Sequence, residues 1–209
     1  MELDALARRA RSLVPGTGRA ILGICGAPGS GKSTLAARLV AEVNRQEGTG
    51  TATQVPMDGF HLADVALDRL GLRDLKGAPE TFDALGYAAL LRRLREESDT
   101  TVYAPGFERD LEQPIAGAIA VAPDARLVVT EGNYLLLADN PWPRVRSALD
   151  ECWYVETEET TRVQRLVARH IAFGKSPEAA RVWVRHVDEP NAALVRASRG
   201  RADLVVALD

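Results

Sequence analysis

An eight-residue stretch, Gly26 to Ser33, constrains this chain more than any other feature, because it reads Gly-Ala-Pro-Gly-Ser-Gly-Lys-Ser. It follows an apolar run over residues 20–25 that is typical of a buried strand, and it precedes a helical pattern over 34–47. The spacing matches the phosphate-binding loop G-x-x-x-x-G-K-S, in which glycines let backbone N–H groups turn toward a polyphosphate. The strand before the motif and the helix after it indicate a nucleoside triphosphate site.

Within this loop, each residue type has a chemical reason to be there. Lys32 can reach the β- and γ-phosphates, and the Ser33 hydroxyl can bind Mg²⁺. The helix that opens at Ser33 directs its N-terminal dipole at the anion. We therefore predict ATP and Mg²⁺ as cofactors. The predicted ATP-binding residues are Gly26, Ala27, Gly29, Ser30, Gly31, Lys32, Ser33 and Thr34.

Size and charge narrow the class of protein. A chain of 209 residues suits a single domain over 1–209, and its net charge of −3 argues against a nucleic-acid partner. Cys25 and Cys152 lie in apolar runs and are interpreted as buried thiols. Glu2 and Asp4 argue against a transit peptide, and no apolar run suits a signal peptide or membrane span. We expect a cytoplasmic protein without a membrane partner, and the sequence leaves a homodimer open.

Apolar runs alternate with helical patterns along the chain, as in a doubly wound, mainly parallel sheet flanked by helices. This pattern, with the phosphate loop, predicts an α/β fold of the P-loop NTPase type. The predicted strands are Ala20–Cys25, Thr53–Met57, Thr101–Ala104, Leu127–Thr130, Cys152–Val155 and Leu204–Val206.

Two acids stand where predicted strands end. In a doubly wound sheet the carboxyl ends of the strands form the ligand crevice, so Asp58 should face the γ-phosphate. A carboxylate there can take the proton of an acceptor hydroxyl during phosphoryl transfer, although Asp58 followed by glycine is also typical of a capped turn. Glu131 ends the apolar run 127–130 and is predicted to bind Mg²⁺ together with Ser33.

A row of arginines follows the fifth predicted strand. Arg162, Arg165 and Arg169 share one face of a helical pattern over 160–173, and a second helix begins at Ser176-Pro177. Such a row is often only a solvated face. Here we predict a helical lid over about 160–190, in which Arg165 and Arg169 neutralise the transferring phosphoryl group.

The order GAPGSGKS, MDGFH, KGAPETFD, TEGNYLL and arginine-rich helix resembles the phosphoribulokinase/uridine kinase/bacterial pantothenate kinase superfamily. Within it, the sequence is most similar to bacterial nucleoside/nucleotide kinase-like proteins of the fructose transport system kinase type. The resemblance implies that Asp58 is the catalytic base and that Glu131 serves magnesium. It also implies that a hairpin at Pro105–Arg109 and a loop at Gly77–Asp83 hold the acceptor.

The acceptor side is therefore assigned to about 58–115, with His61, Asp83, Phe107 and Arg109 as predicted substrate-binding residues. His61 follows Asp58 closely but can equally cap a helix, and Arg109 can grip an anionic or polyhydroxyl acceptor. Uridine kinases carry a histidine further along their hairpin. This sequence has none between Tyr103 and Pro114, which argues against uridine.

The function predicted from these residues is ATP-dependent phosphorylation of a hydroxyl group on a small metabolite: a sugar, a nucleoside or a pantothenate-like compound. Lys32, Asp58, Arg165 and Arg169 are the predicted catalytic residues. Two alternatives remain: a nucleotide-dependent switch or assembly ATPase, and a nucleoside monophosphate kinase. The chain lacks the [NT]-K-x-D motif that reads guanine, which disfavours a GTPase switch.

Overall fold

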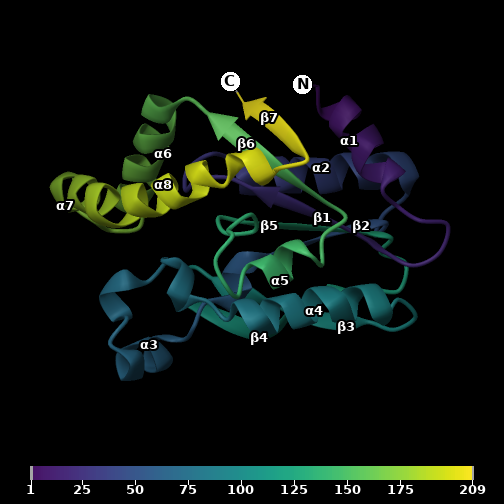
Figure 1. Cartoon of the computed structure of the whole chain (residues 1–209), viewed down its shortest axis with the longest axis horizontal. Helices are drawn as coiled ribbons and strands as arrows, with labels where there is room; N and C mark the ends of the chain where they lie inside the picture. Colours follow the sequence, from purple (N-terminus) through teal and green to yellow (C-terminus); the bar gives the residue numbers. More distant parts are fainter. Residues whose placement is uncertain (1, 209) are drawn as a thin grey trace.

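Five parallel strands form the central sheet of the computed structural model, which describes residues 2–208 (Figure 1). Their spatial order is β2-β5-β1-β6-β7, so the chain passes from the central β1 to β2 at one edge and then returns through β5, across β1, to β6 and β7. Parallel pairing brings the carboxyl ends of these strands to one edge, where doubly wound folds bind ligands. The predicted α/β architecture is confirmed. The strands are β1 Ala20–Cys25, β2 Ala52–Pro56, β5 Leu127–Gly132, β6 Glu151–Thr157 and β7 Leu204–Leu208.

Helices cover both faces of this sheet, because the central strands β1 and β5 are fully buried and mainly apolar. On one face, α1 Leu3–Ser12 and α2 Lys32–Glu47 pack their apolar stripes against side chains such as Leu22 and Trp153. On the other face, α4 Ala84–Glu96, α5 Pro143–Arg146 and α8 Glu189–Ala197 form a second core. The two cores hold the sheet, and thus the ligand edge, in a fixed shape.

The segment between β2 and β5 forms the lower part of the molecule in Figure 1. It contains the short helices η1 Met57–Phe60, α3 Asp64–Leu70, η2 Arg73–Leu75 and η3 Pro79–Thr81, then α4 and the antiparallel hairpin of β3 Val102–Glu108 and β4 Gln113–Val121. The predicted strand at 101–104 therefore exists, but it belongs to a separate two-stranded sheet and not to the parallel one. A local apolar pattern specifies a strand but not its partner.

The segment predicted to be a lid contains a helix–turn–helix, and its function as a lid stays a prediction. Helix α6 Glu159–Ala172 begins with Glu158, whose carboxylate accepts hydrogen bonds from the backbone N–H groups of Thr160 and Thr161. Helix α7 Pro177–Trp183 begins with a Ser176 cap and continues through a π-helical turn, η4 Val184–Asp188, into α8. The short helix η5 Arg199–Arg201 then leads to β7.

The predicted domain limits, 1 and 209, lie outside the described residues. Within residues 2–208, both hydrophobic cores contain side chains of the same five-stranded sheet. In this part of the chain, no helix has the length and hydrophobicity that crossing a membrane requires.

Candidate active site

The phosphate loop joins the end of β1 to the start of α2, as its motif predicts. Gly29 and Gly31 have φ angles of +79° and +89°, which L side chains rarely adopt. A Cβ on Gly29 would also lie 2.8 Å from the carbonyl oxygen of Arg162 in the lid. Two side-chain hydrogen bonds fix the backbone of the loop: Thr157 Oγ1 donates to the Ser30 carbonyl (2.7 Å), and Arg162 Nη1 donates to the Pro28 carbonyl (3.1 Å). The loop is therefore held in shape by β6 and α6.

Ser33 and Glu131 lie together at the ligand edge of the sheet. Glu131 is 4% exposed, and burial raises the pKa of its carboxyl group to about 7. The nearby charge of Lys32 and a hydrogen bond from Ser33 oppose this shift and favour the carboxylate. Mg²⁺ typically binds one or two protein oxygens together with phosphate oxygens and water, so this hydroxyl–carboxylate pair fits it. No cluster of three or more His, Cys, Asp or Glu side chains suited to a metal occurs in residues 2–208.

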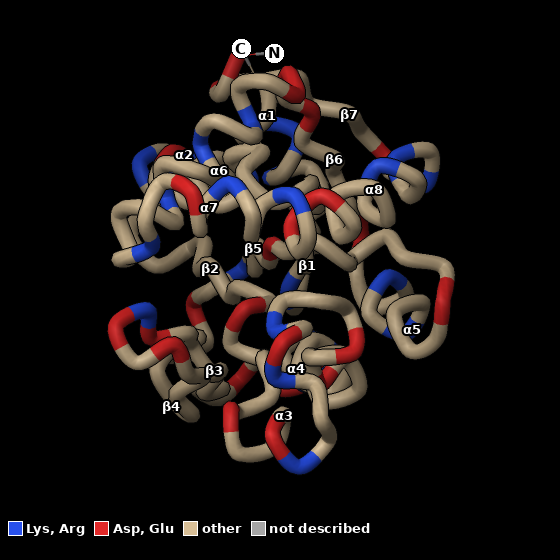
Figure 2. Tube along the Cα trace, turned by 90° about the vertical axis from the view of Figure 1, so that its left-hand side faces the viewer, with Lys and Arg blue, Asp and Glu red and all other residues tan. Residues whose placement is uncertain are grey.

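Asp58 lies in η1, directly after β2, and borders the same cavity as Lys32. This cavity has a volume of about 300 Å³ and separates the lid from the acceptor-side segment. In Figure 2, α6 and α7 lie in the upper part of the molecule and α3, β3 and β4 in the lower part, with Lys and Arg in both parts. Its lining combines six cations with three acids. The cations are Lys32, Arg73, Lys76, Arg109, Arg169 and Lys175, and the acids are Asp58, Glu112 and Asp188.

Three of the four predicted substrate-binding residues, His61, Phe107 and Arg109, line this cavity. The His61 ring stacks on Phe82, with 3.9 Å between centroids, and lies 5.1 Å from Phe107. Burial lowers the pKa of His61 to about 4, so its ring is neutral near pH 7. Arg109 reaches over from the hairpin, and its Nη2 is 3.8 Å from Oδ2 of Asp58. The wall is thus aromatic, with one cation beside the predicted base.

Asp83, the fourth predicted substrate-binding residue, has a different position. It precedes α4, where its Oδ1 accepts a hydrogen bond of 2.8 Å from the backbone N–H of Gly86. Its side chain is exposed and does not border the cavity formed by residues 2–208. The position of Asp83 therefore supports a capping function for its carboxylate, because a helix start leaves N–H groups without partners.

The three arginines of the predicted row have three different environments. Arg169 lines the cavity opposite Asp58. Arg165 is exposed, and its Nη1 lies 3.8 Å from the point that a Cβ on Gly31 would occupy. Arg162 is 2% exposed and pairs with Glu159 (2.7 Å) and with Glu189 of α8. The first turn of α6 is covered by the phosphate loop and α8, whereas the last turns project beyond them. The phosphate-binding roles of Arg165 and Arg169 stay predictions.

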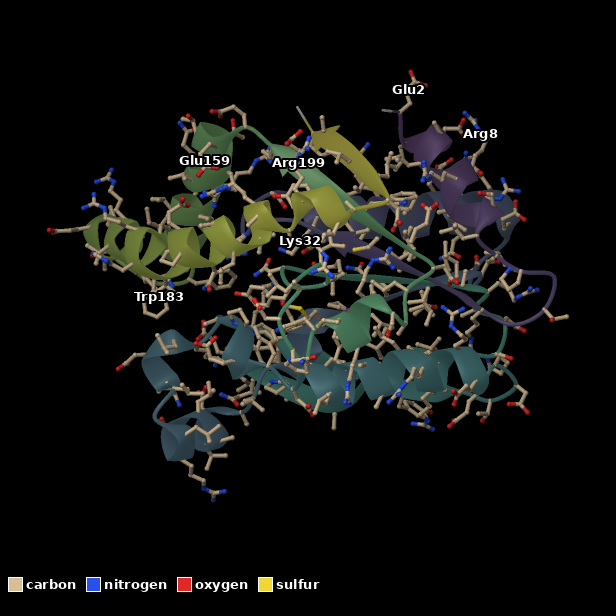
Figure 3. All side chains as sticks on the ribbon, in the orientation of Figure 1. Glu2, Arg8, Lys32, Glu159, Trp183 and Arg199 are labelled. Atoms are coloured by element: carbon tan, nitrogen blue, oxygen red, sulfur yellow. The ribbon has the colours of Figure 1, made fainter. Side chains whose placement is uncertain are left out.

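Several cavity residues were not predicted. His170 is one of them: its Nε2 lies 2.8 Å from Oδ2 of the buried Asp188, and both residues border the cavity. Trp183 lies on the lid and points toward the acceptor-side segment (Figure 3). For Lys76 the sequence did contain a signal of its position at the site, because Lys76 is the first residue of the acceptor-side motif KGAPETFD. Lys175 and Asp188 lie in the lid, and only the packing of the lid brings them to the cavity.

A phosphate-loop motif on a doubly wound sheet, with a buried acid near the end of β5 and a helix–turn–helix beside the loop, is typical of kinases of the P-loop class. Residues 21–208 match the model of the Phosphoribulokinase / Uridine kinase family, and the chain belongs to this family.

Individual relatives agree with this membership. A protein of Schizosaccharomyces pombe named "Putative uridine kinase" is 37% identical over 175 residues, which are 82% of this chain and 74% of that protein. The "Uncharacterized protein YggC" of Escherichia coli is 34% identical over 188 residues, 90% of this chain and 77% of that protein. The structure of a "putative fructose transport system kinase" from Silicibacter sp. has a TM-score of 0.90 and 37% identity, with 99% of each chain covered. Two of these three relatives are thus named as kinases.

Proposed function

We propose that this chain transfers the γ-phosphoryl group of ATP to a hydroxyl group of a small metabolite. One observation carries the proposal: Asp58 and Lys32 border the same cavity from different elements, η1 and the phosphate loop. A carboxylate in that position suits a base for an acceptor hydroxyl that faces the γ-phosphate. The cavity volume of about 300 Å³ is at the lower end for ligand sites and supports a small acceptor, such as a sugar, a nucleoside or a pantothenate-like compound.

In the proposed reaction, the acceptor oxygen forms a bond to the γ-phosphorus while the bond from this phosphorus to the β–γ bridging oxygen breaks. The acceptor proton passes to Asp58, and ADP leaves. Lys32 and Arg169, both at the cavity, stabilise the charge on the transferring phosphoryl oxygens. Bound Mg²⁺ would neutralise phosphate charge, with Ser33 and Glu131 as its protein ligands. The lid excludes water from the reacting groups.

ADP release in the presence of a library of hydroxyl-bearing metabolites tests this function. We expect at least one compound to stimulate ADP release by the wild-type enzyme and to appear as its phosphate ester in mass spectrometry. The Lys32→Ala variant serves as the control for contaminating kinases and should show no stimulation. If the library gives no stimulation while ATP is hydrolysed, the kinase proposal fails and a nucleotide-dependent switch is supported. If only nucleoside monophosphates respond, the acceptor is a phosphate group instead.

A further inference from the structure

Lysine is distributed in this chain in a way that the proposed function does not explain. The chain contains 26 Lys and Arg residues, but only three of them are lysines: Lys32, Lys76 and Lys175. All three line the cavity. Since six of the 26 basic residues border it, a chance distribution would place fewer than one lysine there. Outside the cavity all basic side chains are arginines. We therefore interpret the lysines as serving a function of the cavity.

Arginine and lysine side chains bind anions differently. Arginine offers a broad planar fork, whereas lysine is a compact point charge with three donors, and it binds phosphate and carboxylate groups in that form. Lys32 belongs to the phosphate loop and serves the nucleotide. Lys76 and Lys175 lie outside that loop, one in the acceptor-side segment and one in the turn between α6 and α7. They are therefore available to bind an anion other than the nucleotide.

Lys76 is held in place and has a remaining donor. Its Nζ donates to Oδ1 of Asp64 at 2.7 Å and to the carbonyl oxygen of Glu112 at 2.5 Å, which leaves one of its three N–H groups free. Asp64 and Asp68 also pair with Arg73, at 2.8 and 3.4 Å, so Arg73 is compensated by its neighbours. The Lys76 ammonium lies 5.8 Å from the centroid of Phe107, on the aromatic wall of the cavity.

On the lid side, the positive charge has less compensation. Within residues 2–208, Lys175 forms no ion pair with an acidic side chain and lies over the Trp183 ring, 4.3 Å from its centroid. On the acceptor side, Arg109 of the hairpin has one acidic partner among the described residues, Asp58, at 3.8 Å. A neutral acceptor would leave Lys175 and Arg109 on the cavity wall without an anionic partner, because Asp58 is engaged by the reacting hydroxyl. An anionic acceptor would compensate them and join the lid to the acceptor side.

We propose that the acceptor carries a carboxylate or phosphate group in addition to its reacting hydroxyl, and that this anion binds Lys76 and Lys175 with Arg109 beside it. The inference rests on the proposed function and specifies its substrate class. Because Arg109 is close to Asp58, the anionic group is expected within a few bonds of the reacting hydroxyl. The aromatic rings of His61 and Phe107 cover the carbon skeleton between the two groups.

Matched pairs of acceptors test the inference. The library pairs neutral hydroxyl compounds with carboxylate counterparts, such as glucose with gluconate, and with phosphate counterparts, such as ribose with ribose 5-phosphate. We expect a carboxylate or phosphate member to have a KM at least about tenfold lower than its neutral partner, since a charge-assisted hydrogen bond contributes roughly that factor or more. The two anionic arms distinguish carboxylate from phosphate. Phosphorylation of neutral members with equal or lower KM overturns the anionic acceptor but leaves the kinase intact. Absence of any stimulated ADP release overturns the proposed function itself.

Two substitutions then assign the anion to the lysines. Lys175→Met is expected to raise the KM of the anionic acceptor about tenfold or more, with a smaller effect on kcat, and Lys175→Arg to restore part of the affinity. Arg185→Met is the matched control, because Arg185 is an exposed lid cation outside the cavity lining. Lys76→Met should act in the same direction as Lys175→Met. An unchanged KM for Lys175→Met, or an equal change for Arg185→Met, refutes the assignment.

Discussion

Arg162 provides the sharpest test of how the lid is attached to the phosphate loop. Its guanidinium group is buried, donates to the Pro28 carbonyl at 3.1 Å and pairs with Glu159 and Glu189. Removing one partner of a fully buried ion pair costs about 3–5 kcal/mol. Here Arg196 remains near both carboxylates, at 3.1 and 3.8 Å, and Glu159 is half-exposed. We therefore expect Arg162→Met to lower the free energy of unfolding by about 2–3 kcal/mol.

Urea denaturation followed by circular dichroism measures this loss, and the Tm should fall by about 5–10 °C in a chain of this size. Arg169→Met is the matched control on the same helix, because Arg169 is exposed and its removal leaves no buried acid unpaired. It should change the free energy of unfolding by about 0.5 kcal/mol or less. If the two variants are equally stable, Arg162 does not hold the lid to the loop and the structural distinction between the two arginines is wrong.

Three further predictions concern the site. Lys32→Ala should abolish transfer and weaken ATP binding without changing the Tm, as measured by ADP release and calorimetry; unchanged turnover would contradict the phosphate-loop assignment. Arg169→Met should lower kcat by about a hundredfold or more with little change in ATP affinity, and a kcat within about twofold of wild type would exclude its role. Burial lowers the pKa of His61 from 6.5 to about 4, so the unfolded chain binds a proton in that range that the folded chain does not. Between pH 7 and pH 4 the wild type should therefore lose about 3 kcal/mol more stability than His61→Gln, as compared in urea titrations; parallel curves for both proteins would refute it.

The parts of the fold that the sequence predicted are those encoded locally. The phosphate loop, the buried strand before it and the acid near the end of β5 are each specified by neighbouring residues, and the structure contains all of them. The hairpin was only partly predicted. Its strand β4 has a mixed burial pattern, contains Pro114 and Gly117, and lacks the alternation that identifies a half-buried strand. Its strand conformation depends on pairing with β3, the preceding arm of the hairpin, and not on an alternating pattern of its own.

The acceptor half of the site was less accessible to sequence reasoning, because it is assembled from separate segments. His61 and Arg109 were predicted from short motifs, and both border the cavity. His170 and Lys175 carry no local signal, since a helical pattern does not tell which side of a lid faces the cavity. Arg162 and Arg169 share a helical face, yet one is buried and the other exposed. Only the packing of α6 against the phosphate loop and α8 separates them.

The most direct test of the central claim is the rate of acceptor phosphorylation by Asp58→Asn. The substitution keeps the size and much of the hydrogen bonding of the side chain but removes the charge that accepts the proton. We expect near-normal Mg·ATP binding, with acceptor-stimulated ADP release lower by about two to four orders of magnitude. Unstimulated ATP hydrolysis should fall less, because water need not occupy the position of the acceptor. A stimulated rate equal to that of the wild type would contradict Asp58 as the base and the small-molecule kinase mechanism built on it.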